Sequence, residues 1–326
     1  MSLPTEDEFN LRLVPSILHQ GKRVRAVRKK VFSRPPTETF HEFLNLWVQL
    51  AFGEAWWREQ QSLRVEKQHV VIKWSKAVTA WLTANQIDKN SVGDKLWSVQ
   101  MSGRAQSLLH LGFDLFCLQQ ADLMPDSLVE RLRNYRGFQG ARYEVAVASI
   151  FARAGFRIQF CEEEEGKKIC EFIATLRSGL RVAVEAKSRH RPGILNEKGV
   201  PPDEYRADFK KLYEKARKKK PDLPFVIFID ANLPPAPNIP WEESPWLQDI
   251  KGIFDDFTEP SLDQPDPHNM VVITNYGSFF YGDDLAKLQP ALYIVSEFPI
   301  RQLPNERVLN AIQRVVERYA TIPREV

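Results

Sequence analysis

Residues 170–191, CEFIATLRSGLRVAVEAKSRHR, place three charged side chains inside two runs that otherwise favour buried β-strands. The runs KKICEFIATL and LRVAVEAKS are rich in β-branched and aromatic residues and are separated by a Ser-Gly turn, which predicts a hairpin. Side chains on a strand alternate between faces, so Glu185 and Lys187 share one face, and Glu171 can point to the same side from the neighbouring strand. The charges therefore need a physical reason to stand together on a sheet.

The charged face of this hairpin has two physical interpretations. Two carboxylates held close repel each other, and burying either one without a partner is costly. A divalent cation would remove both costs, because Mg²⁺ favours one or two carboxylates, with water and substrate phosphate completing its shell. Lys187 could then stabilise an attacking water or the charge that develops on a phosphate. The alternative is an edge strand whose charged face is exposed to solvent, with Glu185 and Lys187 forming a surface pair.

The elements expected around the hairpin follow the order α-β-β-β-α-β. Residues 140–155 predict an amphipathic helix closed by a glycine, and the following FRIQF predicts a strand. After the hairpin, a charged helix is expected over 204–219 and a buried strand in 224–234. The rest of the chain is predicted to contain a long acidic, proline-rich loop, two strands and a final helix, at 234–268, 270–276, 291–296 and 305–320.

The first part of the chain is predicted to be an all-helical domain, 1–135, followed by a second domain, 136–326. Apolar residues at helical spacing predict a helix over 40–57, with Thr37 as its N-cap. Further helices are expected over 69–85 and 92–119, and another from residue 126. The expected fold class is therefore α/β, in the α+β sense that helices and strands are largely segregated.

Composition and motifs exclude several classes of protein. The chain has 326 residues and a net charge of only +3, so overall charge does not indicate a nucleic-acid binder. Its three cysteines have no CxxC spacing, which argues against a zinc ribbon or a redox motif. There is no Walker loop, GxGxxG or GxSxG element, which disfavours NTPases, dinucleotide enzymes and α/β serine hydrolases. With no signal pattern and no run of ~18 apolar residues, we expect a cytoplasmic protein without a membrane partner.

Local charge is more informative than the total. Two basic runs stand out, one formed by Lys22, Arg23, Arg25, Arg28, Lys29 and Lys30, the other by Lys210, Lys211, Lys215, Arg217, Lys218, Lys219 and Lys220. Taken alone, each run is interpreted as a solvated face. If the chain binds nucleic acid, both runs become candidates for contacts with the phosphate backbone.

The order helix, hairpin with an acid, E-x-K strand, helix and apolar strand resembles the PD-(D/E)XK nuclease superfamily, in particular its Mrr and Holliday-junction-resolvase-like branches. The resemblance covers 138–233 and implies a restriction-endonuclease-like αβββαβ core. By position, Glu185 and Lys187 match the (D/E)XK element as metal ligand and catalytic lysine. Glu171 falls where the family has the aspartate of its PD element, as a second catalytic metal ligand. Glu144 falls where many members have an accessory acid that helps to bind metal.

The chain departs from the family at one position. Cys170-Glu171 stands in place of the family's Pro-Asp, and glutamate keeps the charge but carries the carboxylate outward by one methylene. This substitution is compatible with an active variant that holds its metal in a shifted position. It is equally compatible with a site that has lost its chemistry.

The resemblance implies a nuclease that uses Mg²⁺ or Mn²⁺ to hydrolyse phosphodiester bonds, in DNA more than RNA, with defence or repair as its setting. The residues expected to contact nucleic acid are Arg142, Arg189, His190, Arg191, Lys210, Lys211 and Lys215. Two alternatives stay open: a catalytically inactive nuclease-like protein that binds nucleic acid, and a protein-interaction scaffold that works through the helical domain. Substrate recognition, partner docking and homodimer formation all suit residues 1–135.

Overall fold

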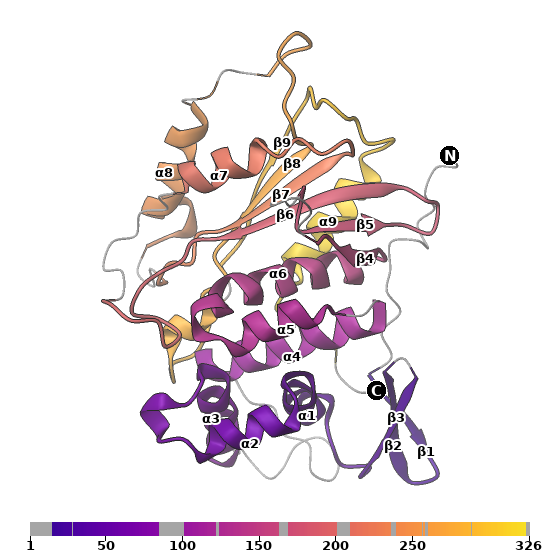
Figure 1. Cartoon of the computed structure of the whole chain (residues 1–326), viewed down its shortest axis with the longest axis vertical. Coiled ribbons are helices and arrows are strands. Elements are labelled where there is room, and N and C mark those ends of the chain that lie inside the picture. Colours follow the sequence, from indigo (N-terminus) through magenta and orange to yellow (C-terminus); the bar gives the residue numbers. More distant parts are fainter. Residues whose placement is uncertain are drawn as a thin grey trace.

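A six-stranded mixed sheet forms the centre of the upper part of the structure in Figure 1. The computed structural model describes residues 15–27, 29–84, 101–121, 124–162, 169–200, 209–235, 239–255, 257, 260–287 and 289–323. The strands, which lie side by side in chain order, are β4 (Arg157–Phe160), β5 (Phe172–Thr175), β6 (Arg181–Ser188), β7 (Phe225–Asp230), β8 (Met270–Thr274) and β9 (Leu292–Val295). Strands β4, β5 and β6 are antiparallel, β6 to β8 are parallel, and β9 is antiparallel to β8.

Helices cover both faces of this sheet. On one face, α6 (Tyr135–Arg153) and α9 (Arg307–Glu317) share a hydrophobic cluster with the β-strand residues Phe172, Val184 and Phe228. On the other face, α7 (Lys210–Arg217) and α8 (Pro245–Asp255) bury Tyr213 and Trp246 against Ala183, Ile227 and Ile229. Figure 1 shows the same three layers, with α7 and α8 on the side opposite α6. The charged face of β6 is therefore the face that α7 covers.

The succession α6-β4-β5-β6-α7-β7 confirms the order predicted for residues 138–233. The two later strands and the final helix are confirmed as β8, β9 and α9. The predicted helix over 204–219 is described from Lys210 onward, because residues 201–208 lie outside the described part of the chain. The strand β7 is buried along its whole length, as a continuous apolar run between two strands requires.

A layer of helices lies beneath α6 in Figure 1. It consists of α1 (Phe40–Phe52), α2 (Glu54–Ser62), α3 (Val70–Ala84), α4 (Gly103–Ala121) and α5 (Asp126–Arg133). The stretch 40–57 forms two helices rather than one, because Gly53, at φ 84°, ends α1 and begins α2. The N-cap is Thr39 and not Thr37: Thr39 accepts from the Glu42 amide, and the Glu42 carboxylate accepts from the Thr39 amide.

The prediction of an all-helical N-terminal domain is wrong, because residues 17–34 form a three-stranded antiparallel sheet. Its strands are β1 (Ile17–His19), β2 (Lys22–Val27) and β3 (Lys30–Arg34). The alternation of buried and exposed positions in β2 could not be recognised from the sequence, because one of the buried positions is a basic residue. Arg25 is buried, with its guanidinium 2.7 Å from the Glu38 carboxylate and over the Phe43 ring. Arg25 thus contributes to packing and not to a basic surface, and Arg28 of the same run lies outside the described residues.

The long loop predicted for 234–268 contains the helix α8. Its buried residues, Trp246, Leu247 and Ile250, are spaced as one helical face, and Pro245 occupies the first helical position, where its missing N–H has no cost. The sequence indicated a loop because proline and acidic residues are abundant around this short amphipathic run. Single-turn 3₁₀ helices occur at η2 (Val65–Lys67), η3 (Trp241–Glu243) and η4 (Ser278–Tyr281).

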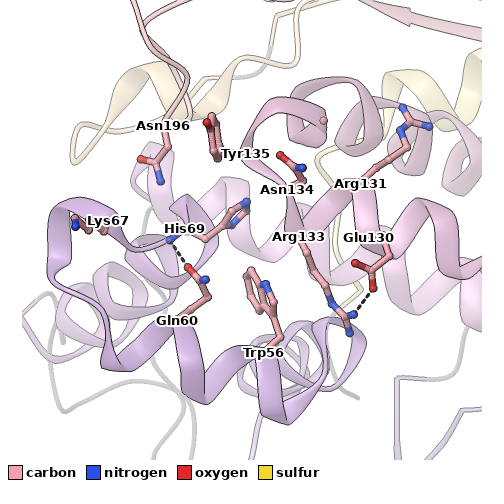
Figure 2. A pocket seen from close by; sticks show the side chains of 11 residues that line it. Trp56, Gln60, Lys67, His69, Glu130, Arg131, Arg133, Asn134, Tyr135 and Asn196 are labelled. Atoms are coloured by element: carbon pink, nitrogen blue, oxygen red, sulfur yellow. Dashed lines mark hydrogen bonds and ion pairs between the residues drawn. The ribbon is translucent and has the colours of Figure 1, made fainter.

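A pocket of about 640 Å³ opens between α2, α5 and the start of α6 (Figure 2). Trp56 and Gln60 of α2 face Arg133 of α5 across it, and Tyr135 lies at the start of α6. In the part of the chain that the structure describes, no helix combines the length and the apolar character needed to cross a membrane.

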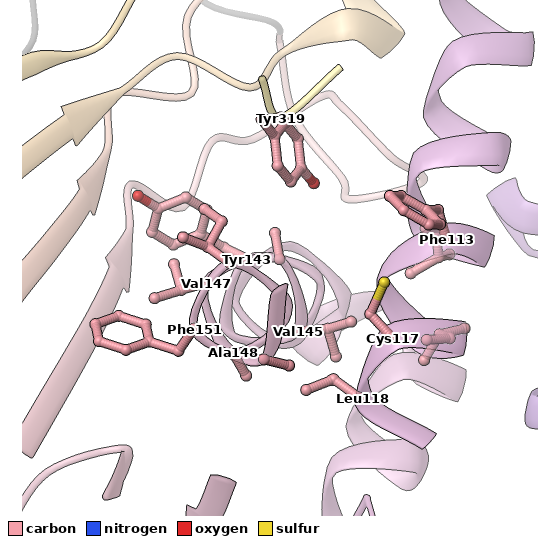
Figure 3. Close-up of a cluster of buried hydrophobic side chains, with 14 of the residues drawn as sticks. Phe113, Cys117, Leu118, Tyr143, Val145, Val147, Ala148, Phe151 and Tyr319 are labelled. Carbon is pink, nitrogen blue, oxygen red and sulfur yellow. The ribbon is translucent and has the colours of Figure 1, made fainter. Parts of the chain in front are cut away.

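One hydrophobic core joins the helical layer to the sheet. Side chains of α4, among them Cys117 and Leu118, pack against Val145 and Ala148 of α6 (Figure 3), and α6 is buried on all sides from Phe138 to Ala152 apart from Gly140. The same cluster contains Val27 near the start of the described chain and Ile322 near its end. The core is thus continuous across the boundary expected at residue 135.

The end of the chain closes this core beneath α4. The Tyr319 hydroxyl donates to Asp114 Oδ2 at 2.6 Å, and the Tyr319 ring stacks on Tyr276 with centroids 4.1 Å apart. The guanidinium of Arg153 donates to the Arg318 carbonyl at 2.9 Å. Burial raises the pKa of Asp114 to about 7, against the hydrogen bonds from Tyr319 and Ser149. The segment after α9 is therefore held by polar as well as apolar contacts.

The close approach of α1 and α4 at Gly112 gives a first prediction. A Cβ at this position would lie 2.9 Å from the Leu44 carbonyl oxygen and 3.1 Å from Val48 Cγ2, so the helices would have to move apart. We expect Gly112→Ala to lower the free energy of unfolding by about 1–3 kcal/mol, because a well-packed interface does not accept an added methyl group. Urea denaturation measures the change. Gly252→Ala, on α8 with open space around its Cβ position, is the control and should not destabilise the protein.

Candidate functional site

Glu171, Glu185 and Lys187 meet on one face of the sheet. The ladder pairs Phe172 with Val184, and the Glu171 amide donates to the Val184 carbonyl at 2.9 Å. Glu171, directly before β5, is therefore held beside Val184, while Glu185 and Lys187 follow on β6, two residues apart on one face. The expectation that alternation brings these three side chains to a common face is confirmed.

Two lysines neutralise the pair of carboxylates. Lys187 Nζ lies 3.0 Å from Glu171 Oε1 and 2.5 Å from Glu185 Oε1, so it bridges the two strands. Lys219, which follows α7, places its Nζ 2.9 Å from the same Glu185 oxygen. Two ammonium groups and two carboxylates thus form one compact group at the junction of β5, β6 and the end of α7. Lys219 entered the sequence argument only as one charge in a basic run.

Burial sets the protonation behaviour of this group. Glu185 is 0% and Glu171 5% exposed, which excludes the interpretation as a solvent-facing surface pair. Burial raises the pKa of Glu185, and Glu171 adds to the effect, whereas Lys187 and Lys219 oppose it. Burial lowers the pKa of Lys187, but the charges of Glu185 and Glu171 outweigh burial and leave that pKa above its usual value. Lys187 is therefore a permanent ammonium at neutral pH, suited to stabilise negative charge and unsuited to act as a base.

The donor set suits a small divalent cation. Oε1 of Glu185 contacts both lysines, whereas Oε2 is buried without a hydrogen-bond partner among the described residues, so this second oxygen has unused acceptor capacity. Two carboxylates are enough for Mg²⁺, whose remaining ligands are water and substrate phosphate. Across the described ranges, no three His, Cys, Asp or Glu side chains gather into a metal-binding cluster. A cation here would accordingly depend on Glu171 and Glu185 with ligands from outside the protein.

Glu144 is not brought into this group. Its carboxylate makes a bidentate pair with Arg131 of α5, with O–N distances of 2.6 and 2.8 Å. The hydrogen bonds that Arg131 donates to Glu144, together with the charge of Glu144, raise the pKa of Arg131 against the effect of burial, and the charge of Glu171 adds to the rise. The prediction of Glu144 as an accessory metal ligand is thus not supported, because a fully formed ion pair already occupies both of its oxygens.

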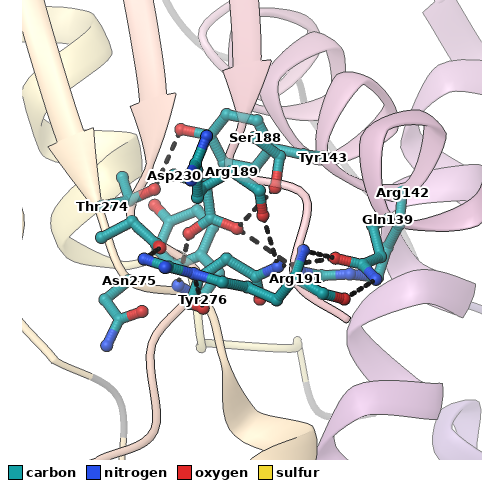
Figure 4. Close-up of polar contacts among 12 residues, drawn as sticks. Gln139, Arg142, Tyr143, Ser188, Arg189, Arg191, Asp230, Thr274, Asn275 and Tyr276 are labelled. Carbon is teal, nitrogen blue, oxygen red and sulfur yellow. Dashed lines mark hydrogen bonds and ion pairs between the residues drawn. The ribbon is translucent and has the colours of Figure 1, made fainter. Parts of the chain in front are cut away.

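Arg142 and Arg191 do not form a basic surface, contrary to the sequence expectation. Both are buried: Arg142 Nη2 lies 3.6 Å from Asp230 Oδ2, and Arg191 donates to the Ala231 and Asn232 carbonyls at 3.1 and 3.3 Å. They belong to the polar network at the carboxyl ends of β6, β7 and β8 (Figure 4). Because these guanidinium groups already bind protein groups, phosphate contact is not supported for either.

The other expected nucleic-acid contacts occupy more accessible positions. Lys210, Lys211 and Lys215 are exposed on α7, which packs on the same face of the sheet as the carboxylate pair. His190 is exposed, 3.7 Å from Glu197 Oε2, and Arg189 is half-buried, with its amide donating to the Asp230 carbonyl at 3.0 Å. Their contact with nucleic acid stays a prediction.

Asp230 is a buried residue that sequence reasoning missed. It ends β7 with 0% exposure, and its carboxylate accepts from the Tyr276 amide at 3.0 Å and lies 3.4 Å from the Ser188 hydroxyl. Burial raises its pKa despite the opposing charge of Arg142. Its place in the apolar run FVIFID gave no sign of an ion pair, because the partner comes from a helix 88 positions earlier in the chain.

Comparison with known proteins gives no relative for this chain: no protein-family model, no curated protein and no solved structure matches it.

Proposed function

We propose that the protein is a metal-dependent nuclease of the PD-(D/E)XK type. The observation that carries this proposal is the Lys187 ammonium, which contacts the buried carboxylates of both Glu171 and Glu185. A buried pair of carboxylates has no structural advantage over apolar residues at these positions. Its retention beside a charged lysine is what phosphodiester hydrolysis with a bound cation would require.

The arrangement of elements supports the finer assignment of a restriction-endonuclease-like core. The antiparallel strands β4, β5 and β6 continue through the crossover helix α7 into β7, which is parallel to β6, while α6 covers the opposite face. In this arrangement the hairpin supplies Glu171, and the strand next to the parallel crossover supplies Glu185 and Lys187. These are the positions that the resemblance assigns to the PD and (D/E)XK elements.

Each residue has a distinct role in the proposed reaction. A bound Mg²⁺ or Mn²⁺ would supply Lewis-acid activation of water and neutralise charge on the phosphate. Glu171 and Glu185 would hold that ion from adjacent strands. Lys187, which stays protonated, would donate to a phosphate oxygen as negative charge develops on it. Lys219 would keep Glu185 ionised by opposing the effect of burial on its pKa.

The exposed lysines of α7 support nucleic acid as the substrate, with DNA preferred to RNA. Lys210, Lys211 and Lys215 project from the helix that covers the carboxylate face. Such side chains attract a phosphate backbone without reading its sequence, and the binding they provide weakens steeply with salt.

Glu185→Gln tests the proposal through two measurements. It keeps the shape of the side chain but removes the charge, so we expect Mn²⁺ binding to fall below detection in calorimetry. Cleavage of plasmid and oligonucleotide DNA with Mg²⁺ or Mn²⁺ should fall at least 100-fold. Glu243→Gln, which alters an exposed carboxylate on η3, is the matched control and should bind and cleave like the wild type. Absence of cleavage by the wild-type protein on any DNA or RNA would refute the nuclease proposal.

One observation favours a second candidate, a nuclease-like protein that binds nucleic acid without cleaving it. Glu144 is committed to Arg131, and both remaining carboxylates are already neutralised by lysines. A site of this kind could be stable without a cation. This candidate predicts no Glu185-dependent Mn²⁺ binding, together with salt-sensitive DNA binding that survives in EDTA.

A further inference from the structure

The pocket between α2, α5 and the start of α6 has a mixed aromatic and basic lining. Trp56 and Tyr135 present half-buried rings to it, and Lys67, Arg131 and Arg133 bring three basic groups against the single carboxylate of Glu130. Figure 2 shows these side chains arriving from separate elements around one space. Flat rings beside an excess of positive charge are a combination that suits a ligand with both a planar and an anionic part.

His69 provides an independent sign of a ligand. It lines the pocket while only 4% exposed, and its Nε2 has no hydrogen-bond partner. Burial, with a smaller contribution from the charge of Lys73, lowers its pKa to about 4, so the ring is neutral at pH 7. Its Nδ1 accepts from the Val71 amide at 3.3 Å, which places the hydrogen of the neutral ring on Nε2. The result is a buried N–H donor at the pocket without an acceptor.

The arginines are fixed in place yet retain unused donors. Arg131 gives its two Nη groups to Glu144, and Arg133 donates from Nε to the Phe52 carbonyl at 2.9 Å and from Nη1 to Glu130 at 2.6 Å. A guanidinium has five N–H donors, so these bonds leave others available. Lys67, on η2, is exposed and adds a mobile charge at the rim.

We propose that this pocket binds a nucleoside phosphate, with the base against Trp56, the phosphate between Lys67 and Arg133, and the unsatisfied His69 N–H beneath the pocket wall. The assignment of that nucleotide to a nucleic-acid strand rests on the proposed nuclease function. The proposal that the pocket binds a nucleoside phosphate does not depend on that function. Arg131 connects the two sites, because it lines the pocket, holds Glu144 and is influenced by the charge of Glu171.

Calorimetric titration in EDTA tests the proposal separately from cleavage, since no metal is present and no hydrolysis is measured. We expect saturable binding of a nucleoside 5′-monophosphate, with inorganic phosphate and the unphosphorylated nucleoside at least tenfold weaker. A short 5′-phosphorylated single-stranded oligonucleotide is the second arm. If it binds at least tenfold more tightly than the free nucleotide, the ligand is a strand end; equal affinities identify a free nucleotide. Failure of both probes to bind would overturn the proposal even if the protein cleaves DNA.

Variants locate the binding. Trp56→Leu should weaken the nucleotide about tenfold by removing the stacking surface. Lys67→Gln should weaken it about threefold and reduce the salt dependence, and because Lys67 is exposed this variant has no cause to misfold. Lys251→Gln, at an exposed lysine on α8 outside both basic runs, is the charge-matched control and should bind like the wild type. Wild-type affinity in both Trp56→Leu and Lys67→Gln would overturn the site.

Discussion

Replacing Lys187 by alanine is expected to lower the rate of phosphodiester cleavage by about 100- to 1,000-fold. The reason is that Lys187 is the ammonium in contact with both carboxylates, and removal of one preorganised donor from a charge-stabilising site has an effect of this size. Single-turnover cleavage of a labelled duplex with saturating Mn²⁺ measures the rate. The substrate affinity should change much less than the rate, since exposed lysines of α7 supply the backbone contacts.

The control for this variant is Lys251→Ala, which removes an exposed lysine of α8 that belongs to neither basic run. It should cleave at the wild-type rate. Equal cleavage by Lys187→Ala and the wild type would remove Lys187 from the mechanism, and the three-residue group would then have only a structural role.

The Lys187→Ala variant should also have its own dependence on pH. Without this ammonium, the effect of burial on Glu185 is less opposed, so the pKa of Glu185 in the folded protein rises further. Between the unfolded and folded pKa values the folded state holds a proton that the unfolded state releases, and stability falls as the pH rises through that window. Urea midpoints of the variant should accordingly increase relative to the wild type when the pH is lowered from 8 to 5. Adding Glu185→Gln should abolish this difference.

The second large effect is expected for Arg142→Met, which should lower the free energy of unfolding by about 3–5 kcal/mol. The substitution leaves the fully buried Asp230 without its only basic partner among the described ion pairs, and it removes the guanidinium that lies over the Phe279 ring. Urea denaturation at pH 7 measures the loss. Lowering the pH should recover part of it as Asp230 becomes protonated.

A double variant separates charge burial from loss of packing. Arg142→Met combined with Asp230→Asn carries no unpaired charge, and the amide retains hydrogen-bonding capacity toward the Tyr276 amide and the Ser188 hydroxyl. It should regain at least half of the lost stability. If Arg142→Met is instead as stable as the wild type but binds DNA more weakly, the original expectation of a phosphate contact would be restored.

The hairpin and its charged face could be predicted because they depend on local regularities. Strand alternation fixes which side chains share a face, and a short turn leaves few registers, so the meeting of Glu171 with Glu185 followed from the sequence. Lys219 could not be located in the same way. Its position depends on how α7 returns to the sheet after a crossover, and no local pattern distinguishes it from the lysines around it.

Where the structure departs from what the sequence indicates, the cause is a partner that is distant along the chain. Glu144 lies near the buried stripe of α6, as expected, but its carboxylate forms an ion pair with Arg131 of the preceding helix. From the sequence, Arg25 is expected to be an exposed charge, but in the structure it packs between Glu38 and Phe43. Because this inward-facing position is charged, the alternating pattern of the small N-terminal sheet could not be recognised. A charged residue in a sequence indicates exposure only on average, and tertiary pairing overrides that average at individual positions.

The contact between Tyr319 and Asp114 has a consequence for how the protein is made. The hydroxyl that satisfies Asp114 comes from a residue translated 205 positions later. Until residue 319 has been synthesised and has left the ribosome, α4 and α6 can associate, but the carboxyl group at their interface lacks its donor and the face awaiting α9 is open to chaperones and proteases. Assembly of this core therefore waits for residue 319, and premature stop codons before that residue should yield degraded protein and not a shortened functional one.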